Sequence, residues 1–278
     1  MRGPRAVLRD ARYALPGAIE RVATGPGPAA AARRCLRLNQ SGRGATLGYF
    51  QAAAAGPEEI VAVNQAAISW FRERPGDVQL ALKAPPLGFD AARIRTVAEA
   101  ADAAGLALIF DAHGPGQAAP TLAAARDLLP DFPRTGIVLP ARWRRSLEDA
   151  AAFRETTARI RLVKGEWADP DWGEADVAEN YLALVQGLAG RAAPVAVATH
   201  DPALAERALA ALLAAGTPCE LEQLRGLPGR RTAAVARRLG VPVRVYVPFG
   251  PGWWPYAVDK ALARPYLLSW TIRDLLGR

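Results

Sequence analysis

The stretch Ile-Arg-Leu-Val-Lys-Gly at residues 160–165 decides the fold, together with the two segments that follow it. It is a short apolar run with the length of a buried strand, and a longer segment of helical periodicity follows at residues 176–190. A second apolar run, Val-Ala-Val-Ala-Thr-His, then occupies residues 195–200. A strand, a helix and another strand in this order predict two parallel strands joined by a crossover helix.

The same unit recurs along most of the chain. Eight apolar runs alternate with longer amphipathic segments that we predict to be helices. The predicted strands are Ala45–Tyr49, Val78–Ala84, Leu106–Ala112, Gly136–Pro140, Ile160–Gly165, Val195–His200, Cys219–Leu224 and Val243–Phe249. The predicted helices are Pro57–Arg74, Ala91–Ala104, Ala118–Leu129, Ser146–Thr157, Asp176–Gly190, Pro202–Ala215, Gly229–Leu239 and a last one from Tyr256 onward.

Eight strand–helix units in series predict a closed parallel barrel, the α/β fold called the (β/α)8 or TIM barrel. Such barrels need about 250 residues, and the chain has 278 residues. An open, doubly wound sheet is the competing fold, but it requires a glycine-rich turn after its first strand, and the sequence has none there. We therefore predict one barrel over residues 41–278, preceded by an N-terminal helical arm over residues 1–40.

Composition narrows the class of protein. No apolar run approaches the roughly 20 residues that cross a membrane, and the Arg-rich residues 1–15 lack the apolar block of a secretory signal. We therefore expect a cytoplasmic protein whose two cysteines are free thiols. The formal charge is +8, but the basic residues are scattered doublets without a zinc-finger or RNA-binding motif, so nucleic-acid binding is the less favoured interpretation.

Polar residues gather where the predicted strands end, and the carboxyl ends of the strands carry the active site in barrels of this kind. They are Lys83, Asp111 with His113, Arg161 with Lys164, Thr199 with His200, Glu220 with Glu222, and Arg244 with Tyr246. Three of the 35 basic residues are lysines, and two of these, Lys83 and Lys164, are in this group. A lysine retained in so Arg-rich a chain suggests a chemical role, because a compact ammonium differs from a guanidinium. The spacing of the histidines and carboxylates matches no metal site, so we expect no metal.

Several of these strand ends resemble motifs of the proline dehydrogenase family. The fifth predicted strand reads Arg-Leu-Val-Lys-Gly at 161–165, which is the family's most recognisable string. The sixth reads Ala-Thr-His-Asp at 198–201, similar to the family's Ala-Thr-His-Asn. Residues 220–226, and 244–250 with Trp-Pro-Tyr after them, are also similar. The resemblance covers about residues 41–265, and the order and spacing of the motifs make it more specific than any one motif.

This resemblance implies FAD, held without covalent attachment at the strand ends. Arg161 would lie near the reactive N5 edge of the flavin, where a cation stabilises the negative charge of the reduced ring. Other residues implied to contact the cofactor are Lys164, Gly165, Thr199, His200 and Glu220. The residues implied on the substrate side are Lys83, Asp111, Tyr246, Tyr256 and Lys260, with Arg161 also taking part in catalysis.

The substrate half of the pattern departs from the family more than the flavin half. The family's Tyr-x-x-Arg-Arg, whose arginines fork onto a substrate carboxylate, here reads Tyr-Ala-Val-Asp-Lys, ending in Asp259 and Lys260. An aspartate at that position repels an anionic ligand. Glu222 replaces a glutamine of the family pattern, Trp167 a tyrosine and His113 an acid.

We therefore predict an FAD-dependent oxidoreductase that removes a hydride from a carbon next to nitrogen and passes it to flavin N5. The predicted substrate is a modified amino or imino acid, a cyclic amine or a hydrazine-like compound of specialised metabolism, in preference to free proline. A quinone or oxygen is the candidate electron acceptor. The alternative is a barrel that has lost the flavin and serves as a lyase, a hydrolase or a small-molecule binding protein.

Overall fold

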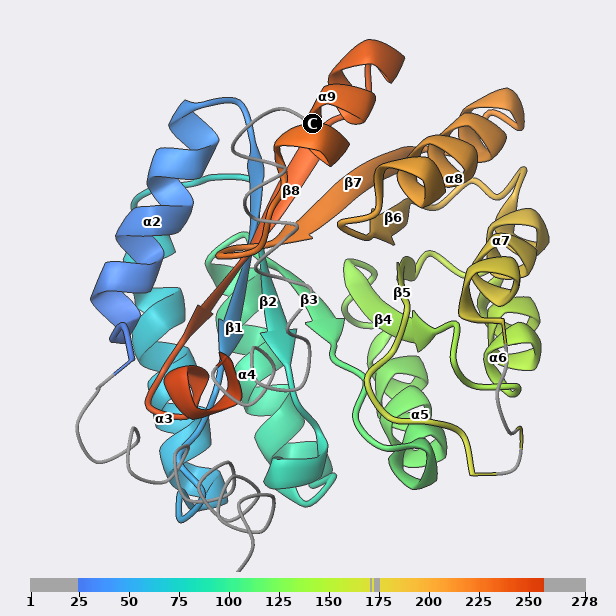
Figure 1. Ribbon diagram of the computed structural model, residues 1–278. Coiled ribbons are helices and arrows are strands. Elements are labelled where there is room, and N and C mark those ends of the chain that lie inside the picture. Colours follow the sequence, from blue (N-terminus) through green and yellow to red (C-terminus); the bar gives the residue numbers. More distant parts are fainter. Residues whose placement is uncertain (1–24, 171, 173–175, 258–278) are drawn as a thin grey trace, which may run out of the picture.

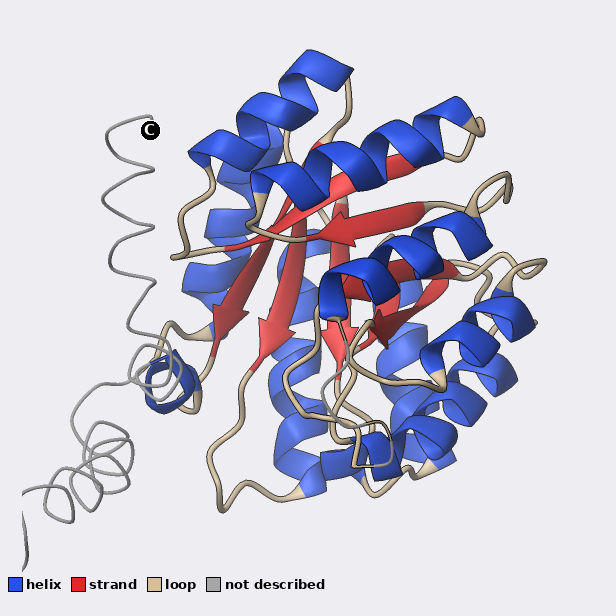
Figure 2. Cartoon of the chain, turned by 45° about the vertical axis from the view of Figure 1, so that its right-hand side comes forward, coloured by secondary structure: helices blue, strands red, loops and turns tan. Residues whose placement is uncertain are grey.

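The computed structural model describes residues 25–170, 172 and 176–257. Eight parallel strands form a closed barrel in the order β1 to β8, and β1 pairs with β8 to complete the ring. Helices surround the strands on the outside (Figure 1), and all the strand arrows point toward the same end of the barrel (Figure 2). The predicted (β/α)8 fold is confirmed.

Each strand is followed by at least one helix. The strands are β1 (Gly44–Tyr49), β2 (Val78–Leu82), β3 (Ala107–Phe110), β4 (Thr135–Pro140), β5 (Arg159–Val163), β6 (Val195–Ala198), β7 (Cys219–Leu224) and β8 (Val243–Phe249). The α-helices are α2 (Pro28–Gln40), α3 (Pro57–Ile68), α4 (Ala91–Ala103), α5 (Ala118–Leu128), α6 (Ser146–Phe153), α7 (Val177–Leu188), α8 (Pro202–Ala214) and α9 (Arg230–Leu239). Residues 253–257, after β8, are also helical.

The predicted strands run past the observed ends of several strands. Lys83 and Asp111 come just after β2 and β3, and Thr199 and His200 follow β6. These residues lie in the loops at the carboxyl ends of the strands, which is where a barrel builds its active site. The predicted helix from Tyr256 onward lies outside the described residues beyond position 257.

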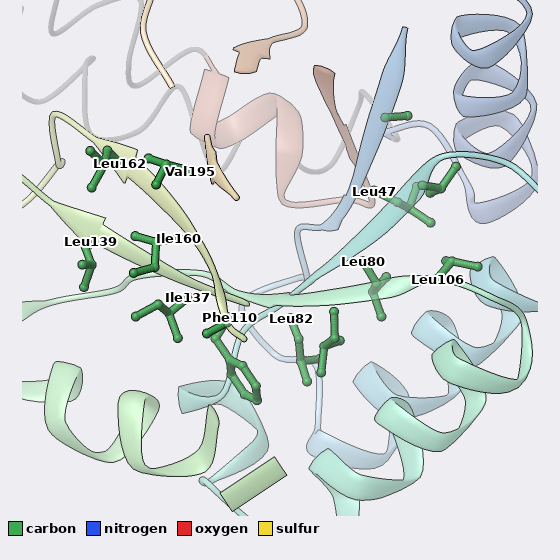
Figure 3. Close-up of a cluster of buried hydrophobic side chains, with 14 of the residues drawn as sticks. Leu47, Leu80, Leu82, Leu106, Phe110, Ile137, Leu139, Ile160, Leu162 and Val195 are labelled. Carbon is green, nitrogen blue, oxygen red and sulfur yellow. The ribbon is translucent and has the colours of Figure 1, made fainter. Parts of the chain in front are cut away.

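Successive side chains along each strand point alternately toward the surrounding helices and toward the barrel interior. On β5, Ile160 and Leu162 belong to the large apolar cluster between the sheet and the helices, whereas Arg161 between them faces the barrel interior. Figure 3 shows members of that cluster, with Leu82 and Phe110 directed away from the strands toward the helices. The apolar residues therefore hold the helices on the barrel, and the interior is left for polar chemistry.

Aspartates fix where two helices begin close to the strand ends. Asp176 accepts hydrogen bonds from the backbone N–H groups of Ala178 and Glu179 at 3.0 and 3.1 Å. Asp201 caps α8 in the same way, through Ala203 and Leu204. Helix α9 ends at Gly240, which adopts φ 68°, in the left-handed region that favours glycine at a helix C-terminus.

Helix α2 lies within the predicted N-terminal arm. It packs against β1, β8 and α3, and its buried face consists of Ala31, Ala32, Cys35 and Leu38. The division of the chain into an arm and a barrel at residue 40 stays a prediction. In the described part of the chain, every helix falls short of the length and apolarity that a membrane crossing requires.

Candidate active site

A cavity of about 570 Å³ lies at the carboxyl ends of the strands. Most of the residues predicted for catalysis or cofactor binding line it, namely Lys83, Asp111, Arg161, Lys164, Gly165, Thr199, His200, Tyr246 and Tyr256. These side chains come from β5, β8 and loops that are far apart in the sequence. The closure of the barrel therefore brings residues that are far apart in the sequence to one cavity.

Arg161 forms the floor of this cavity and is 5% exposed. Its Nη1 donates to Glu222 Oε1 at 2.9 Å, and its Nη2 donates to Asp111 Oδ1. Burial alone would lower the pKa of the guanidinium, but Glu222 and Asp111 outweigh burial and raise it. Arg161 Nε is buried without a hydrogen-bond partner among the described residues. A permanent cation thus lies at the base of the cavity with one donor still to be used.

Asp111 joins three other site residues. It accepts from Arg161, its Oδ2 accepts from the Tyr246 hydroxyl at 2.8 Å, and Lys83 Nζ lies 3.7 Å from the same oxygen. Burial opposes ionisation of Asp111, but Arg161 and Lys83 reverse that effect and lower its pKa. Asp111 is therefore a carboxylate that orients its neighbours, because its charge is already shared among two cations and a hydroxyl donor.

Lys83 is held beside the cavity by backbone and by an aromatic ring. Its Nζ donates to the Tyr49 carbonyl at 2.5 Å and lies 4.2 Å from the centre of the Phe50 ring. Burial lowers the pKa of the ammonium, and Asp111 offsets this in part. The pKa of the Lys83 ammonium is therefore lower than that of a surface lysine, so it gives up its proton at a lower pH.

Tyr246 can enter the barrel because Gly48 faces it. A Cβ on Gly48 would lie 2.0 Å from the Tyr246 hydroxyl oxygen. The pKa of Tyr246 is raised, first by burial and then by Asp111, so the phenol remains a donor. Its ring also lies 5.2 Å from the Arg161 guanidinium carbon. Gly48 is thus a residue of the site that contributes by having no side chain.

Lys164, Gly165 and Thr199 follow β5 and β6 on one side of the cavity. Lys164 is 41% exposed, and its Nζ lies 3.3 Å from Asp201 Oδ2. Thr199 is buried, and its Oγ1 accepts from the Asp201 N–H at 3.1 Å. Gly165 has φ 90°, in the left-handed region that favours glycine. Asp201, the cap of α8, therefore ties both polar side chains to the start of that helix.

His200 has both ring nitrogens in contact with backbone. The Leu224 N–H donates to Nε2 at 2.9 Å, so Nε2 must be the acceptor and Nδ1 carries the hydrogen. Nδ1 then donates to the Pro228 carbonyl at 2.6 Å. His200 is a neutral imidazole that holds the loop after β7, and its predicted contact with the cofactor stays a prediction.

Aromatic residues surround the cavity nearer its mouth. Trp167 is 42% exposed and stacks with His113 at a centroid distance of 6.0 Å. Tyr256 packs on Phe50 at 5.1 Å, and its hydroxyl donates to Glu166 Oε2 at 3.1 Å. These contacts give the cavity flat apolar walls around a charged floor.

Glu220 and Arg244 lie elsewhere, and their predicted position at the carboxyl end is wrong. Each is the second residue of its strand, and Arg244 Nε donates to Glu220 Oε1 at 2.7 Å at the amino end of the barrel. Glu220 also pairs with Arg159 and is absent from the cavity lining. Inward positions recur every second residue, so a polar residue at either end of a strand gives the same pattern. Lys260, predicted for catalysis, and Asp259 lie outside the described residues.

Sequence reasoning missed the role of Glu222. It was noted as a departure from the family pattern, but it is 2% exposed, lines the cavity and pairs with Arg161. Thr46 also belongs to this network, donating to Glu222 Oε1 at 2.7 Å and accepting from Gln79 at 2.8 Å. Thr46 and Gln79 are polar residues on otherwise apolar strands, and this pattern could have indicated the network from the sequence.

Comparisons with known proteins agree with this geometry. Residues 31–253 match the family described as Proline dehydrogenase. Proline dehydrogenase 1 of Bacillus subtilis subsp. natto is 27% identical over 266 residues, which cover 89% of this chain and 87% of that protein. Proline dehydrogenase of Deinococcus radiodurans is 27% identical over 232 residues, covering 80% of this chain and 71% of the relative.

Solved structures share the fold. Proline utilization A from Bdellovibrio bacteriovorus superposes with a TM-score of 0.75 at 18% identity, over 86% of this chain. The match takes up 32% of that chain, so the protein spans about a third of the length of this structural relative. The chain belongs to the proline dehydrogenase family, and with it to the FAD-dependent oxidoreductases that act on C–N bonds.

Proposed function

We propose that the protein oxidises the C–N bond of proline or of a related amino or imino acid, cyclic amine or hydrazine-like compound. The observation that carries the proposal is the Arg161 guanidinium, buried at the cavity floor between two carboxylates with its Nε unpartnered among the described residues. A fixed cation that is itself shielded from water stabilises negative charge that develops on a bound electron acceptor. FAD, the cofactor of the family, is that acceptor.

The cavity suits FAD in size and in chemistry. Its volume of about 570 Å³ is within the range of sites that bury a ligand's ring system. Three residues that line it each have a buried polar atom without a hydrogen-bond partner in the described chain, and these atoms are Arg161 Nε, His113 Nε2 and Glu222 Oε2. When bound, FAD would supply the two-electron acceptor for a hydride from the carbon next to nitrogen.

The chain's own residues prepare the substrate. A nearby cation lowers the pKa of an amine, so Lys83 favours the neutral amine, which can release a hydride from its neighbouring carbon. Tyr246 holds Asp111, and Asp111 in turn holds Arg161 and Lys83 in place. The stacked pair of His113 and Trp167 gives this part of the cavity an aromatic wall.

The outer residues hold the rest of the cofactor in this proposal. Lys164 is the most exposed of them and suits an anionic phosphate as a point charge. Gly165, Thr199 and His200 lie beside it along the same side of the cavity. Lys260, outside the described residues, is proposed to serve as a point charge toward the substrate. A cytoplasmic location and a role in specialised metabolism stay predictions.

Anaerobic reduction of the bound flavin tests this function. The purified protein, with FAD added where needed, should be yellow and should bleach when mixed with its substrate. The panel comprises L-proline, its amide, pyrrolidine and a substituted hydrazine, with a quinone or oxygen added afterwards to restore the colour. Protein that takes up no FAD would overturn the proposal and favour a barrel without flavin. Flavin that no member of the panel bleaches would overturn the assigned substrate class.

A further inference from the structure

Glu222 holds Arg161 and leaves one of its own oxygens unused. Its Oε1 accepts from Thr46 at 2.7 Å and from Arg161 at 2.9 Å. Its Oε2 is buried, and no described residue donates to it. Glu222 lines the cavity and is 2% exposed, so its charge lies beside the cavity and is shielded from bulk water.

Glu222 also decides the charge of the cavity. The ionic side chains that line it in the described part of the chain are three cations, Lys83, Arg161 and Lys164, and three carboxylates, Asp111, Glu166 and Glu222. With Glu222 ionised, these groups balance. With an uncharged amide at position 222, the same cavity would carry a surplus positive charge next to Arg161. Charges on side chains as buried as Arg161 and Glu222 act more strongly on a bound ion than charges in bulk water do.

We infer that Glu222 is a specificity-determining residue that directs this site toward amines whose reacting, deprotonated form is neutral. The inference rests on the proposed function and names the substrate class within it. Cyclic amines without a carboxylate, or with a masked one, meet a cavity whose charges balance. An amino acid with a deprotonated amine is an anion. Its affinity for the cavity is lower than it would be without Glu222, because the Glu222 carboxylate offsets one of the three cations.

The chain contains a matched control on the same strand. Glu220 is also buried and also pairs with arginines, Arg244 and Arg159, but it does not line the cavity. Glu220→Gln therefore removes the same charge from the barrel interior at the opposite end. An effect specific to Glu222 separates a role in ligand selection from a general effect of losing a buried carboxylate.

The test compares ligand charge in the wild-type protein and in Glu222→Gln. Two rings that cannot be dehydrogenated in the same way serve as probes, cyclopentanecarboxylate as the anion and trimethyl(cyclopentyl)ammonium as the cation. Their affinities are measured from the shift in thermal unfolding of the protein as purified. Glu222→Gln should raise the affinity for the anion relative to the cation by about tenfold, which is about 1.4 kcal/mol. In flavin-loaded protein, kcat/KM for L-proline relative to pyrrolidine should rise in the same direction.

Each outcome decides the inference. An unchanged preference in Glu222→Gln, or an equal change in Glu220→Gln, would overturn it. If Glu222→Gln does not fold, the wild-type protein still decides, because a strong preference for the anion over the cation would contradict a balanced cavity. Probe affinities are measured in the protein with and without added FAD. A protein without FAD would therefore overturn the proposed function, and the charge preference would be judged separately.

Discussion

Each end of the barrel holds a buried arginine between carboxylates, but the two arginines are satisfied to different degrees. At the amino end, all three nitrogens of Arg244 have partners, with Nε bonded to Glu220 at 2.7 Å, Nη1 to the Ala45 carbonyl at 2.8 Å and Nη2 to Asp77 at 2.6 Å. At the carboxyl end, Nε of Arg161 has no partner among the described residues. Arg159, which also pairs with Glu220 at the amino end, has a buried Nε without a described partner as well. What sets Arg161 apart is that it also lines the cavity, whereas Arg159 and Arg244 do not.

This difference separates a structural cluster from a functional one. A buried arginine with every donor used has nothing left for a ligand, and removing it exposes its carboxylates to an apolar interior. A buried arginine with a free donor toward a cavity leaves a polar atom unsatisfied, which proteins retain where a ligand completes the bonding. The two ends can therefore be distinguished by mutation.

The largest effect is expected from Arg161→Ala. Loss of the cation should lower the rate of flavin reduction by about 10²–10³-fold, because the negative charge of the reduced ring is no longer stabilised. Asp111 and Glu222 would also lose their shared partner, so the free energy of unfolding should fall as well. Stopped-flow anaerobic reduction measures the first effect. Unchanged reduction kinetics would refute the position given to Arg161.

Arg244→Ala should give the opposite balance of effects. The change leaves Glu220 and Asp77 without this partner, so the free energy of unfolding should fall by about 3–5 kcal/mol, as is typical of a broken buried pair. Flavin reduction, measured well below the unfolding temperature, should stay within about threefold of wild type, since an effect of about 0.6 kcal/mol or less is expected at a distance. Urea unfolding and the reduction rate together test it. A large fall in the rate would contradict the separation of the two ends.

The sequence predicted the fold well because the barrel depends on a repeated pattern. Strands β7 and β8 were assigned with the observed bounds, since apolar residues recur at alternate positions along most of each strand. The ends of β2, β3 and β6 were placed too late, because Lys83, Asp111 and Thr199 continue the local pattern into the loops. Pairing with the neighbouring strand, which sets the observed ends, is not visible locally.

The site was predicted in part for a physical reason. Lys83 and Asp111 were found because each stands at the end of an apolar run, whereas Arg161 and Tyr246 lie within their strands and were found through the resemblance to the family. Glu220 was placed at the wrong end, since alternation along a strand does not tell which inward residue lies at which end. The pairing of Glu222 with Arg161 joins residues 61 positions apart and required the closed barrel.

Gly48→Ala tests the close packing of Tyr246 in the cluster around Arg161. The added Cβ would lie 2.0 Å from the Tyr246 hydroxyl oxygen, so the ring must move away from Asp111. We expect a loss of about 1–3 kcal/mol in the free energy of unfolding, as for other overpacked interiors, together with slower flavin reduction. Gly187→Ala in α7 is the control, because a Cβ there meets nothing within 4 Å and should be neutral or stabilising. Equal effects of the two substitutions would contradict the close packing of Tyr246.

The smallest expected effect is a dependence of the free energy of unfolding on pH, and it comes from His113 at the carboxyl end of the barrel. Burial, and after it Lys83, lowers the pKa of His113 below its ordinary value of 6.5. Between the lowered pKa and that value the unfolded chain binds more protons than the folded one, so stability should rise with pH there and level off above about 6.5. His113→Gln should flatten this rise. Urea unfolding of both proteins at several pH values through this window measures it, and an equal slope in the variant would show that another group is responsible. The amino-end cluster of Arg244, Glu220 and Asp77 includes no histidine. Substitutions there should therefore change the free energy of unfolding by the same amount at every pH in this window.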